Sequence, residues 1–327
     1  MAKQRFADPW WRQFDTPTDG FRDCTGFVSR IPLRLESTEM IVFGTVDAGK
    51  MWAEFSNEEF QPILVGGKAV ISIWFNNFSD TDCGGSYLET WYNTFVTRRD
   101  QPQLSLPMDS PLSVIIDHPQ CQNFLQRVVC GDMPGNPGGA MKAVVGGRSV
   151  FGFPKHPELG LINFSYGEKD GKKISWDFDA SHKGKTCISA RIALPEVDPN
   201  CIPVPLDVAS PNDLVIGSPV LGGTHRGDNG AHQVFFGQTL AGTQNTALWN
   251  PETDSIVIGD DAHYGTPLSR WNFQPLVKGH IPDFKIAARK PVGWISGAEA
   301  AAAVKEHEKM MAAGLKPGAI NTPWSKL

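Results

Sequence analysis

Alternation of apolar and polar residues is the clearest pattern in the chain, and it is strongest after residue 160. Apolar residues occupy every second position in 162–166, in 174–178 and in much of 186–194. A period of two is the pattern of a strand with one buried face. The first two segments are joined by a turn that contains Asp170 and Gly171, a dipeptide that favours a tight hairpin. These residues predict an antiparallel meander.

Further strands are predicted upstream, at 40–46, 68–75 and 86–96. In the last of these, Glu89 shares a face with Tyr87 and a tryptophan, because side chains two positions apart in a strand point the same way. A carboxylate between two aromatic rings loses contact with water. We therefore expect Glu89 to be paired or to have a raised pKa.

Three intervening segments lack the alternation. Residues 76–85 are rich in turn-forming residues and predict a link, and residues 117–130 predict a brief helix or an irregular insertion. Residues 137–145 predict a short helix that stops at Gly146 and Gly147, since glycine is favoured just past a helix end. The helical content predicted for the body of the chain is therefore small.

The two ends of the chain differ from the middle. Residues 1–27 are rich in aromatic side chains, and we expect an arm that packs on the body or on a neighbouring subunit. Residues 296–314 begin with a capping box and continue as an alanine-rich stretch, which predicts a C-terminal helix. No linker or internal repeat divides the sequence. We expect a single domain, residues 1–327, of the mainly β (α+β) class.

Composition and charge agree with this class and narrow the partners. The 327 residues include 33 glycines and 25 prolines, which favours many turns and short strands. Apolar residues make up 41% and charged residues 20%, as in a globular protein. A net charge of −5 offers no basic surface, so no nucleic acid partner is expected. No apolar run approaches the roughly 18 residues of a membrane helix, so no membrane partner is expected either.

The cysteines and histidines do not form a recognisable framework. The six cysteines are scattered without a C-x-x-C pair, which favours reduced thiols and offers no zinc site. His225 and His232 lie in one region but lack the spacing of metal ligands. The N-terminus has no apolar core of signal-peptide length. We expect a cytoplasmic protein with no metal and no cofactor.

A lysine lies in an unusual segment, GGRSVFGFPKHPELG, at residues 146–160. Pro154 fixes its own φ and biases Phe153 towards an extended conformation, so the backbone before Lys155 is restricted to one conformation. A lysine on an apolar wall loses water around its ammonium, which lowers its pKa, and a neutral amine attacks carbonyls to form a Schiff base. The alternative is a lysine whose stem crosses an aromatic patch and whose ammonium reaches solvent.

This segment resembles the lysine motif of the acetoacetate decarboxylase-like superfamily. In that motif a glycine-arginine pair is followed by a few residues, an aromatic residue, a proline and the Schiff-base lysine. Gly147, Arg148, Phe153, Pro154 and Lys155 match it without a gap. The resemblance implies that Lys155 is the nucleophile.

A second motif, CGGSYLETWYNTF, resembles the family's strand with glycine, tyrosine and glutamate. It gives Glu89 the place of the family's active-site carboxylate. The likeness covers roughly residues 28–290 and implies an antiparallel β-barrel or cone with a few short helices.

The chain also departs from the family pattern. The decarboxylases have a second lysine after the nucleophile, and His156 occupies that position here. A histidine with an ordinary pKa is mostly neutral at pH 7, so Lys155 is expected to rely chiefly on burial for a lowered pKa. His156 would tune Lys155 or act as an acid–base catalyst, which makes Lys155, Glu89 and His156 the implied catalytic residues.

Other departures concern the substrate. The gapless alignment places Trp74 where the decarboxylases have a second glutamate. Arg30 is a possible match to a family arginine that faces the site, and a structural surface arginine is the alternative. The implied substrate-binding residues are Arg30, Trp74, Tyr87 and Phe151. Trp74 and the aromatic residues around it suggest a substrate larger and more apolar than acetoacetate.

The resemblance implies a Schiff-base lyase that acts on a small-molecule β-keto acid or a related carbonyl compound, in the manner of a decarboxylase. Aldol cleavage or condensation, dehydration and cyclisation can use the same imine and are the first alternative. A non-catalytic β protein that binds a hydrophobic ligand is the second. Members of the family assemble into oligomers, so a homo-oligomer is expected.

Overall fold

Most of the residues that the structure describes lie in strands. The structure is a computed structural model, and it describes residues 5–17, 19–22, 28–55, 60–108, 110, 121–149, 153–195, 202–208, 215–217, 232–233, 238–288 and 295–296. The few helices in these residues are short. The mainly β class predicted from the sequence is therefore confirmed.

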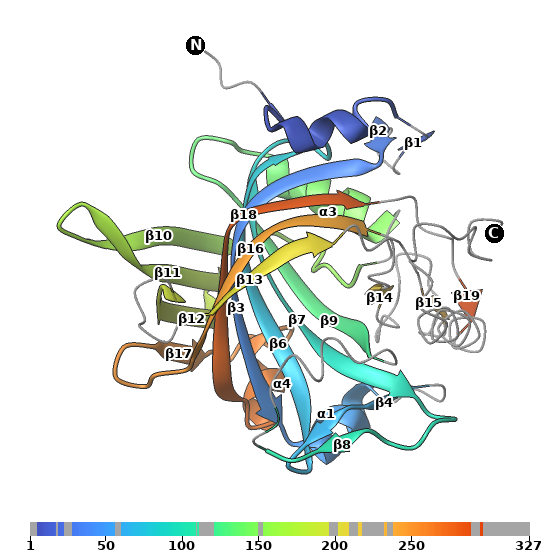
Figure 1. Ribbon diagram of the computed structural model, residues 1–327, viewed down its shortest axis with the longest axis vertical. Coiled ribbons are helices and arrows are strands. Elements are labelled where there is room, and N and C mark those ends of the chain that lie inside the picture. Colours follow the sequence, from blue (N-terminus) through green and yellow to red (C-terminus); the bar gives the residue numbers. More distant parts are fainter. Residues whose placement is uncertain are drawn as a thin grey trace.

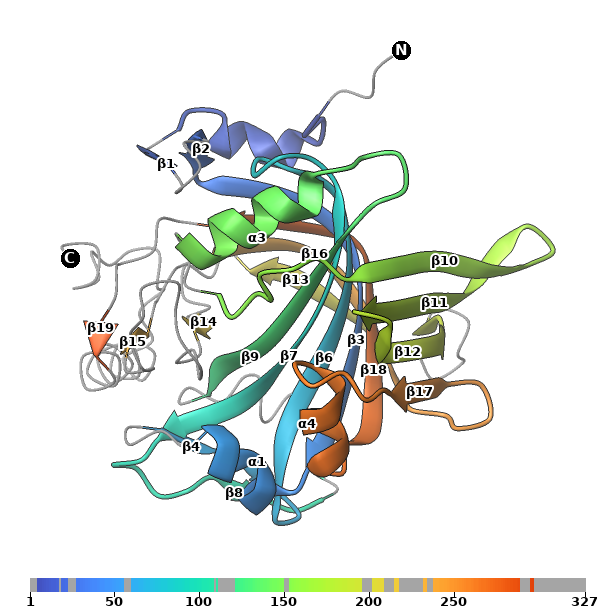
Figure 2. The ribbon, with the colours of Figure 1, turned by 180° about the vertical axis from the view of Figure 1, so that it is seen from behind.

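The larger sheet has eleven strands. They are β3 (Leu33–Val46), β4 (Phe60–Pro62), β5 (Leu64–Val65), β6 (Lys68–Thr81), β7 (Tyr87–Arg98), β8 (Ser105–Leu106), β9 (Gln122–Asp132), β13 (Ile202–Val208), β14 (Val215–Gly217), β16 (Gln238–Leu248) and β18 (Gln274–Ala288). Their order is β13-β16-β18-β3-β6-β7-β9-β14, with β4, β5 and β8 attached at the side. The pairs are antiparallel except β14 with β9 and β5 with β8. The strands bend along their length, so the barrel or cone that the resemblance implied is seen here as a strongly curved sheet (Figures 1 and 2).

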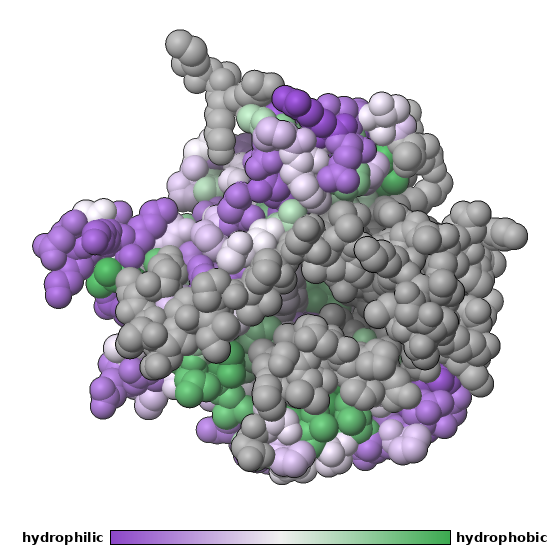
Figure 3. All heavy atoms as spheres, in the orientation of Figure 1, coloured by the Kyte–Doolittle hydropathy of each residue, from purple (hydrophilic) through white to green (hydrophobic). Residues whose placement is uncertain are grey.

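The smaller sheet is the predicted meander, which is confirmed. Its strands are β10 (Leu161–Lys169), β11 (Lys172–His182), β12 (Lys185–Ala193) and β17 (Ser255–Ile258), in that order. Asp170 and Gly171 both have positive φ, 52° and 73°, which the tight hairpin turn requires. The hairpin of β10 and β11 projects from the body, and most of its visible surface is hydrophilic (Figure 3).

The two sheets pack against each other through one face of the larger sheet. The rings of Phe75 in β6 and Phe178 in β11 meet edge to face at 5.0 Å. Two helices, α1 (Ala48–Phe55) and α4 (Gly265–Arg270), contribute to the same core. The Tyr264 hydroxyl, next to α4, lies 2.7 Å from the Thr90 hydroxyl of β7. The sequence pattern did not reveal α4, because its six residues are too few to show a helical period.

A second core lies on the opposite face of the larger sheet, beneath α3 (Gly139–Ser149). Strand β7 contributes to both cores. Leu88 faces the first and Tyr87 faces the second, as its alternation predicted. Glu89 shares the parity of Tyr87 and therefore also faces the second core. The candidate chemistry thus lies between the larger sheet and α3.

Three local predictions were wrong. Strand β6 continues through the expected link to Thr81, because its polar residues pair with β3 and β7 along the ladder. Residues 122–132 form strand β9 and not a helix or irregular insertion. A register shift opposite Tyr92 and Asn93 breaks the alternation that would have revealed it. Helix α3 does not stop at Gly146 and Gly147 but continues to Ser149.

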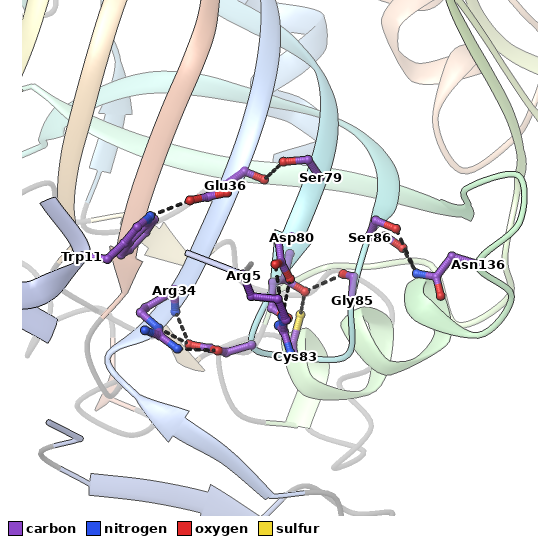
Figure 4. Close-up of polar contacts among 12 residues, drawn as sticks. Arg5, Trp11, Arg34, Glu36, Ser79, Asp80, Cys83, Gly85, Ser86 and Asn136 are labelled. Carbon is purple, nitrogen blue, oxygen red and sulfur yellow. Dashed lines mark hydrogen bonds and ion pairs between the residues drawn. The ribbon is translucent and has the colours of Figure 1, made fainter. Parts of the chain in front are cut away.

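The aromatic arm packs on the body. Trp11, in the short helix η1 (Pro9–Phe14), is buried, and its indole nitrogen donates to the Glu36 carboxylate at 2.6 Å (Figure 4). Arg5 pairs with Asp80 near the end of β6. Strands β1 (Asp19–Arg22) and β2 (Val28–Ile31) form a hairpin-like pair beside it.

The C-terminal prediction lies almost entirely outside the described residues. Strand β19 (Ile295–Ser296) pairs with β15 (His232–Gln233), and the rest of the helix predicted at 296–314 is not among the described residues. No helix in the part of the chain that the structure describes has the length and apolar character needed to cross a membrane.

Candidate active site

Lys155 is held on the inner surface of the larger sheet by its backbone. It forms an isolated parallel bridge with Val128 of β9. The Val128 N–H donates to the Pro154 carbonyl at 3.3 Å, and the His156 N–H donates to the Val128 carbonyl at 2.8 Å. The Arg148 guanidinium, at the end of α3, donates to the Lys155 carbonyl at 2.5 Å. These bonds explain the spacing of Arg148 and Lys155 in the motif, because Arg148 must reach the Lys155 carbonyl.

Gly147 leaves room for the lysine side chain. A Cβ atom at Gly147 would lie 2.6 Å from Cε and 2.7 Å from Cδ of Lys155, well inside the contact distance of about 3.5–4.0 Å between carbon atoms. The glycine that the sequence presented as a helix stop is therefore a close-approach glycine within the helix. The neighbouring Gly146 has no atom within 4 Å of such a Cβ.

Lys155 and Glu89 are in contact. Lys155 is 4% exposed, and its ammonium donates to Glu89 Oε2. The Cys130 thiol donates to the same oxygen at 2.9 Å from the opposite position on β9. The two residues that the sequence singled out from segments 66 residues apart thus form one buried ion pair.

The expectation that burial would lower the pKa of Lys155 is wrong for this arrangement. Burial does lower that pKa, but the charges of the Cys130 and Glu89 side chains and the hydrogen bond to Glu89 together outweigh it, and the pKa of Lys155 lies above its ordinary value. Burial raises the pKa of the Cys130 thiol well above its usual range, so the thiol is neutral at pH 7. Glu89 is therefore the group that holds the ammonium.

A row of polar residues crosses the sheet beside this pair. Glu39 of β3 lies opposite Asn76 of β6, Asn76 lies opposite Glu89 of β7, and Glu89 lies opposite Cys130 of β9. Each strand contributes one member at the same level, so all four side chains emerge on the face beneath α3. All four are buried.

Glu39 is a second acid that the sequence reading missed. It is 0% exposed, and its Oε1 accepts a hydrogen bond from the Ser37 hydroxyl at 2.8 Å. Burial raises the pKa of Glu39 to about 8; the Ser37 hydrogen bond opposes the rise and the charge of Glu89 adds to it. At neutral pH, Glu39 is therefore mostly a neutral carboxylic acid. The sequence did contain a signal for Glu39. It is a charged residue on the face of β3 that also carries the buried apolar residues Leu35 and Ile41.

Aromatic pairs border the polar row on both sides. Trp74 and Trp91 stack at 5.4 Å on one side, and Phe78 and Tyr87 stack at 4.7 Å on the other. Lys155 Nζ lies 5.3 Å from the centre of the Tyr87 ring. Trp74 and Tyr87, both predicted to bind substrate, thus lie next to the Lys155–Glu89 pair.

His156 lies in a different environment from Lys155. Its ring packs on His182 at 4.1 Å and on His263 at 4.5 Å, towards the smaller sheet. Burial and the neighbouring His182 lower its pKa, so it is neutral at pH 7. The predicted catalytic role placed His156 beside the nucleophile. The structure instead gives it a position in a histidine cluster, because adjacent side chains of an extended segment point to opposite sides.

The remaining predicted residues are not brought to this pair by the contacts described. Arg30 donates to the Phe14 carbonyl and lies 3.8 Å from the Asp82 carboxylate, so its partners are the arm and the β6–β7 turn. This agrees with the structural alternative for Arg30. Phe151 lies outside the described residues.

A surface groove of about 550 Å³ lies at the start of α3 but has a different character. Asp80 and Asp82 line it, and they are already paired with Arg5 and Arg34 (Figure 4). Because both carboxylates already have arginine partners, the groove is a weaker candidate site than the Lys155–Glu89 pair.

The fold is similar to that of solved enzymes. The enduracididine biosynthesis enzyme MppR with bound HEPES matches with a TM-score of 0.51 and 10% identity, over 81% of this chain and 88% of that chain. The complex of MppR with pyruvate matches with a TM-score of 0.50 and 11% identity, over 81% and 90%. An acetoacetate decarboxylase-like enzyme from Sphingomonas wittichii RW1 matches with a TM-score of 0.50 and 10% identity, over 79% and 92%. No family model and no curated protein matches the sequence. The chain has the acetoacetate decarboxylase-like fold.

The two adjacent glycines of α3 provide a matched test of the lysine's position. Gly147→Ala should lower the free energy of unfolding by about 1–3 kcal/mol, because the methyl group overlaps the Lys155 stem. Gly146→Ala should leave it unchanged or raise it by up to about 1 kcal/mol, because alanine favours the helix and the space is open. Urea unfolding of both variants measures this; equal effects would contradict the close packing.

The pH dependence of stability tests the protonation of Glu39. Glu39 of the unfolded chain ionises near its ordinary pKa of 4.5, and in the folded chain it keeps its proton up to about pH 8. Between these values the wild type loses roughly 1.4 kcal/mol of stability per pH unit through this group, and the loss ends above the folded pKa. Glu39→Gln has no such proton. Its stability relative to the wild type should therefore rise from pH 5 to pH 8 in urea unfolding; a constant difference would contradict the raised pKa.

Proposed function

We propose that this protein is a lyase that binds a carbonyl substrate as a Schiff base on Lys155. The contact between Lys155 and Glu89 supports this most directly, because it gives a buried amine a proton acceptor at the point where the amine must become neutral. The similarity of the fold to enzymes, one of them solved with pyruvate, agrees with a carbonyl substrate.

Imine formation on a charged lysine requires a proton to leave. Transfer from the Lys155 ammonium to the Glu89 carboxylate produces two neutral groups, which a dry site favours relative to separated charges. The free amine then attacks the substrate carbonyl, and Glu89 can return the proton to the oxygen that leaves as water. Activation thus depends on the partner carboxylate and not on burial alone.

The iminium ion withdraws electrons from the bond β to the nitrogen. Loss of carbon dioxide from a β-keto acid and cleavage of a β-hydroxy carbonyl compound both leave the same enamine. Protonation and hydrolysis of that enamine release the product and restore Lys155. The aromatic pairs beside the polar row provide apolar surface for the rest of the substrate.

The competing proposal is a non-catalytic binder in which the Lys155–Glu89 pair is only structural. A buried ion pair alone is compatible with that role. The two proposals differ in covalent chemistry, which a trapping experiment detects.

Borohydride reduction in the presence of pyruvate or acetoacetate should leave a covalent adduct on Lys155, located by peptide mass spectrometry. Lys155→Arg should give no adduct, because the guanidinium stays protonated and cannot form an imine. Lys142→Arg, on the exposed side of α3, is the matched control and should trap as the wild type does. An unmodified Lys155 in the wild type with both ketones would support the binder.

Replacement of the acceptor should shift the pH at which the imine forms. In Glu89→Gln the carboxylate charge and its hydrogen bond to the ammonium are lost while the burial remains, so the pKa of Lys155 should fall. The pH for half-maximal adduct formation should therefore be lower than in the wild type. A profile that stays in place would show that Glu89 does not control the pKa of the amine, and a profile that moves to higher pH would contradict the predicted sign of its effect.

A further inference from the structure

We propose that Glu39 is the general acid–base group of this site. It acts on the oxygen that is bonded to the substrate carbon β to the imine carbon. The substrate class is then β-hydroxy carbonyl compounds, which the protein would make or cleave by aldol chemistry. This inference rests on the proposed imine at Lys155 and selects among the reactions that the imine permits.

The position of Glu39 relative to the imine supports this role. Adjacent strands are about 4.8 Å apart, so Asn76 lies one strand from Glu89 and Glu39 lies two. The nitrogen of the imine would occupy the place where Lys155 now contacts Glu89. A substrate that extends from that nitrogen across the sheet therefore carries its β oxygen towards Asn76 and Glu39.

Two buried polar atoms in the row lack a partner. Glu39 Oε2 and Asn76 Oδ1 have no hydrogen-bond partner among the described residues, although both side chains are 0% exposed. Each has its other polar atom in use: Glu39 Oε1 accepts from Ser37, and Asn76 Nδ2 donates to the Glu89 carbonyl at 3.2 Å. A buried polar atom without a hydrogen-bond partner is unfavourable, so a ligand that satisfies both atoms is favoured.

A hydroxyl group satisfies this pair. Glu39, when protonated, donates one hydrogen bond, and Asn76 Oδ1 accepts one. A substrate hydroxyl accepts from the first and donates to the second. A carboxylate would leave Asn76 Oδ1 unpaired and would bring a second negative charge next to Glu89, so the row fits a β-hydroxy carbonyl compound better than a β-keto acid.

The reaction balances with these groups. In condensation, the enamine on Lys155 attacks an aldehyde carbon, a carbon–carbon bond forms, and the aldehyde oxygen takes the Glu39 proton to become the hydroxyl. Water then hydrolyses the iminium and releases the β-hydroxy ketone. Glu39 regains its proton from the α carbon when the next enamine forms. Cleavage is the reverse, with ionised Glu39 accepting the hydroxyl proton as the carbon–carbon bond breaks.

The test uses 4-hydroxy-4-phenylbutan-2-one, a neutral β-hydroxy ketone that cleaves to acetone and benzaldehyde. The wild type should release benzaldehyde, with a rate that rises as pH passes the pKa of Glu39, about 8. Glu39→Gln should slow cleavage by at least about 100-fold and lose this pH dependence. It should still give the borohydride adduct on Lys155, because glutamine keeps the size of the side chain.

Glu36→Gln is the matched control. Glu36 lies on the same strand, but its carboxylate accepts from Trp11 on the other side. This variant should cleave and trap as the wild type does. Cleavage at the wild-type rate by Glu39→Gln, or a wild type that traps the ketone without cleaving it, would overturn the role of Glu39 while leaving the imine intact. A wild type that traps no ketone at all would overturn the proposed function, and this inference with it.

Discussion

The contact between the Lys155 ammonium and the Glu89 carboxylate is the interaction around which this face of the protein is built. Both groups are almost fully removed from water, and a buried charge is tolerated only when it is paired. The surrounding structure is arranged to keep them together. Gly147 lets the lysine stem pass against α3, Arg148 holds the lysine carbonyl, and Val128 fixes the segment to β9.

The curved sheet forms the polar row because β3, β6, β7 and β9 each place one polar side chain directly opposite the next. Its other face is occupied by the smaller sheet and α4, so the polar row lies within a framework that is apolar on both sides. Glu89 of this row is paired with the oppositely charged Lys155, and Glu39 is mostly neutral at pH 7 because of its burial and the charge of Glu89. A proton can therefore pass from Lys155 to Glu89 without leaving an unpaired charge.

The sequence was sufficient for the features that depend on local pattern. The meander and the two faces of β7 follow from alternation, and proline geometry and the family motifs single out Lys155 and Glu89, which the structure brings into contact. It was insufficient where the outcome depends on pairing between distant strands. Glu39 becomes a neighbour of Glu89 only through Asn76 and two ladders.

Other failures have equally specific causes. Burial of Lys155 was anticipated, but the sign of its pKa shift depends on a partner from another strand. His156 was assigned to the lysine because it follows it in sequence, whereas the backbone directs the two side chains to opposite sides. Gly147 was taken as a helix stop, since its actual role, close approach to Lys155, is visible only in three dimensions.

Magnetic resonance of the bound substrate tests the imine on Lys155 most directly. Protein with an isotope label in the lysine side-chain nitrogens is mixed with pyruvate labelled at its carbonyl carbon. We expect a one-bond carbon–nitrogen coupling in the wild type that Lys155→Arg lacks. A bound pyruvate whose carbonyl carbon remains an unmodified ketone, with no coupling to nitrogen, would contradict it.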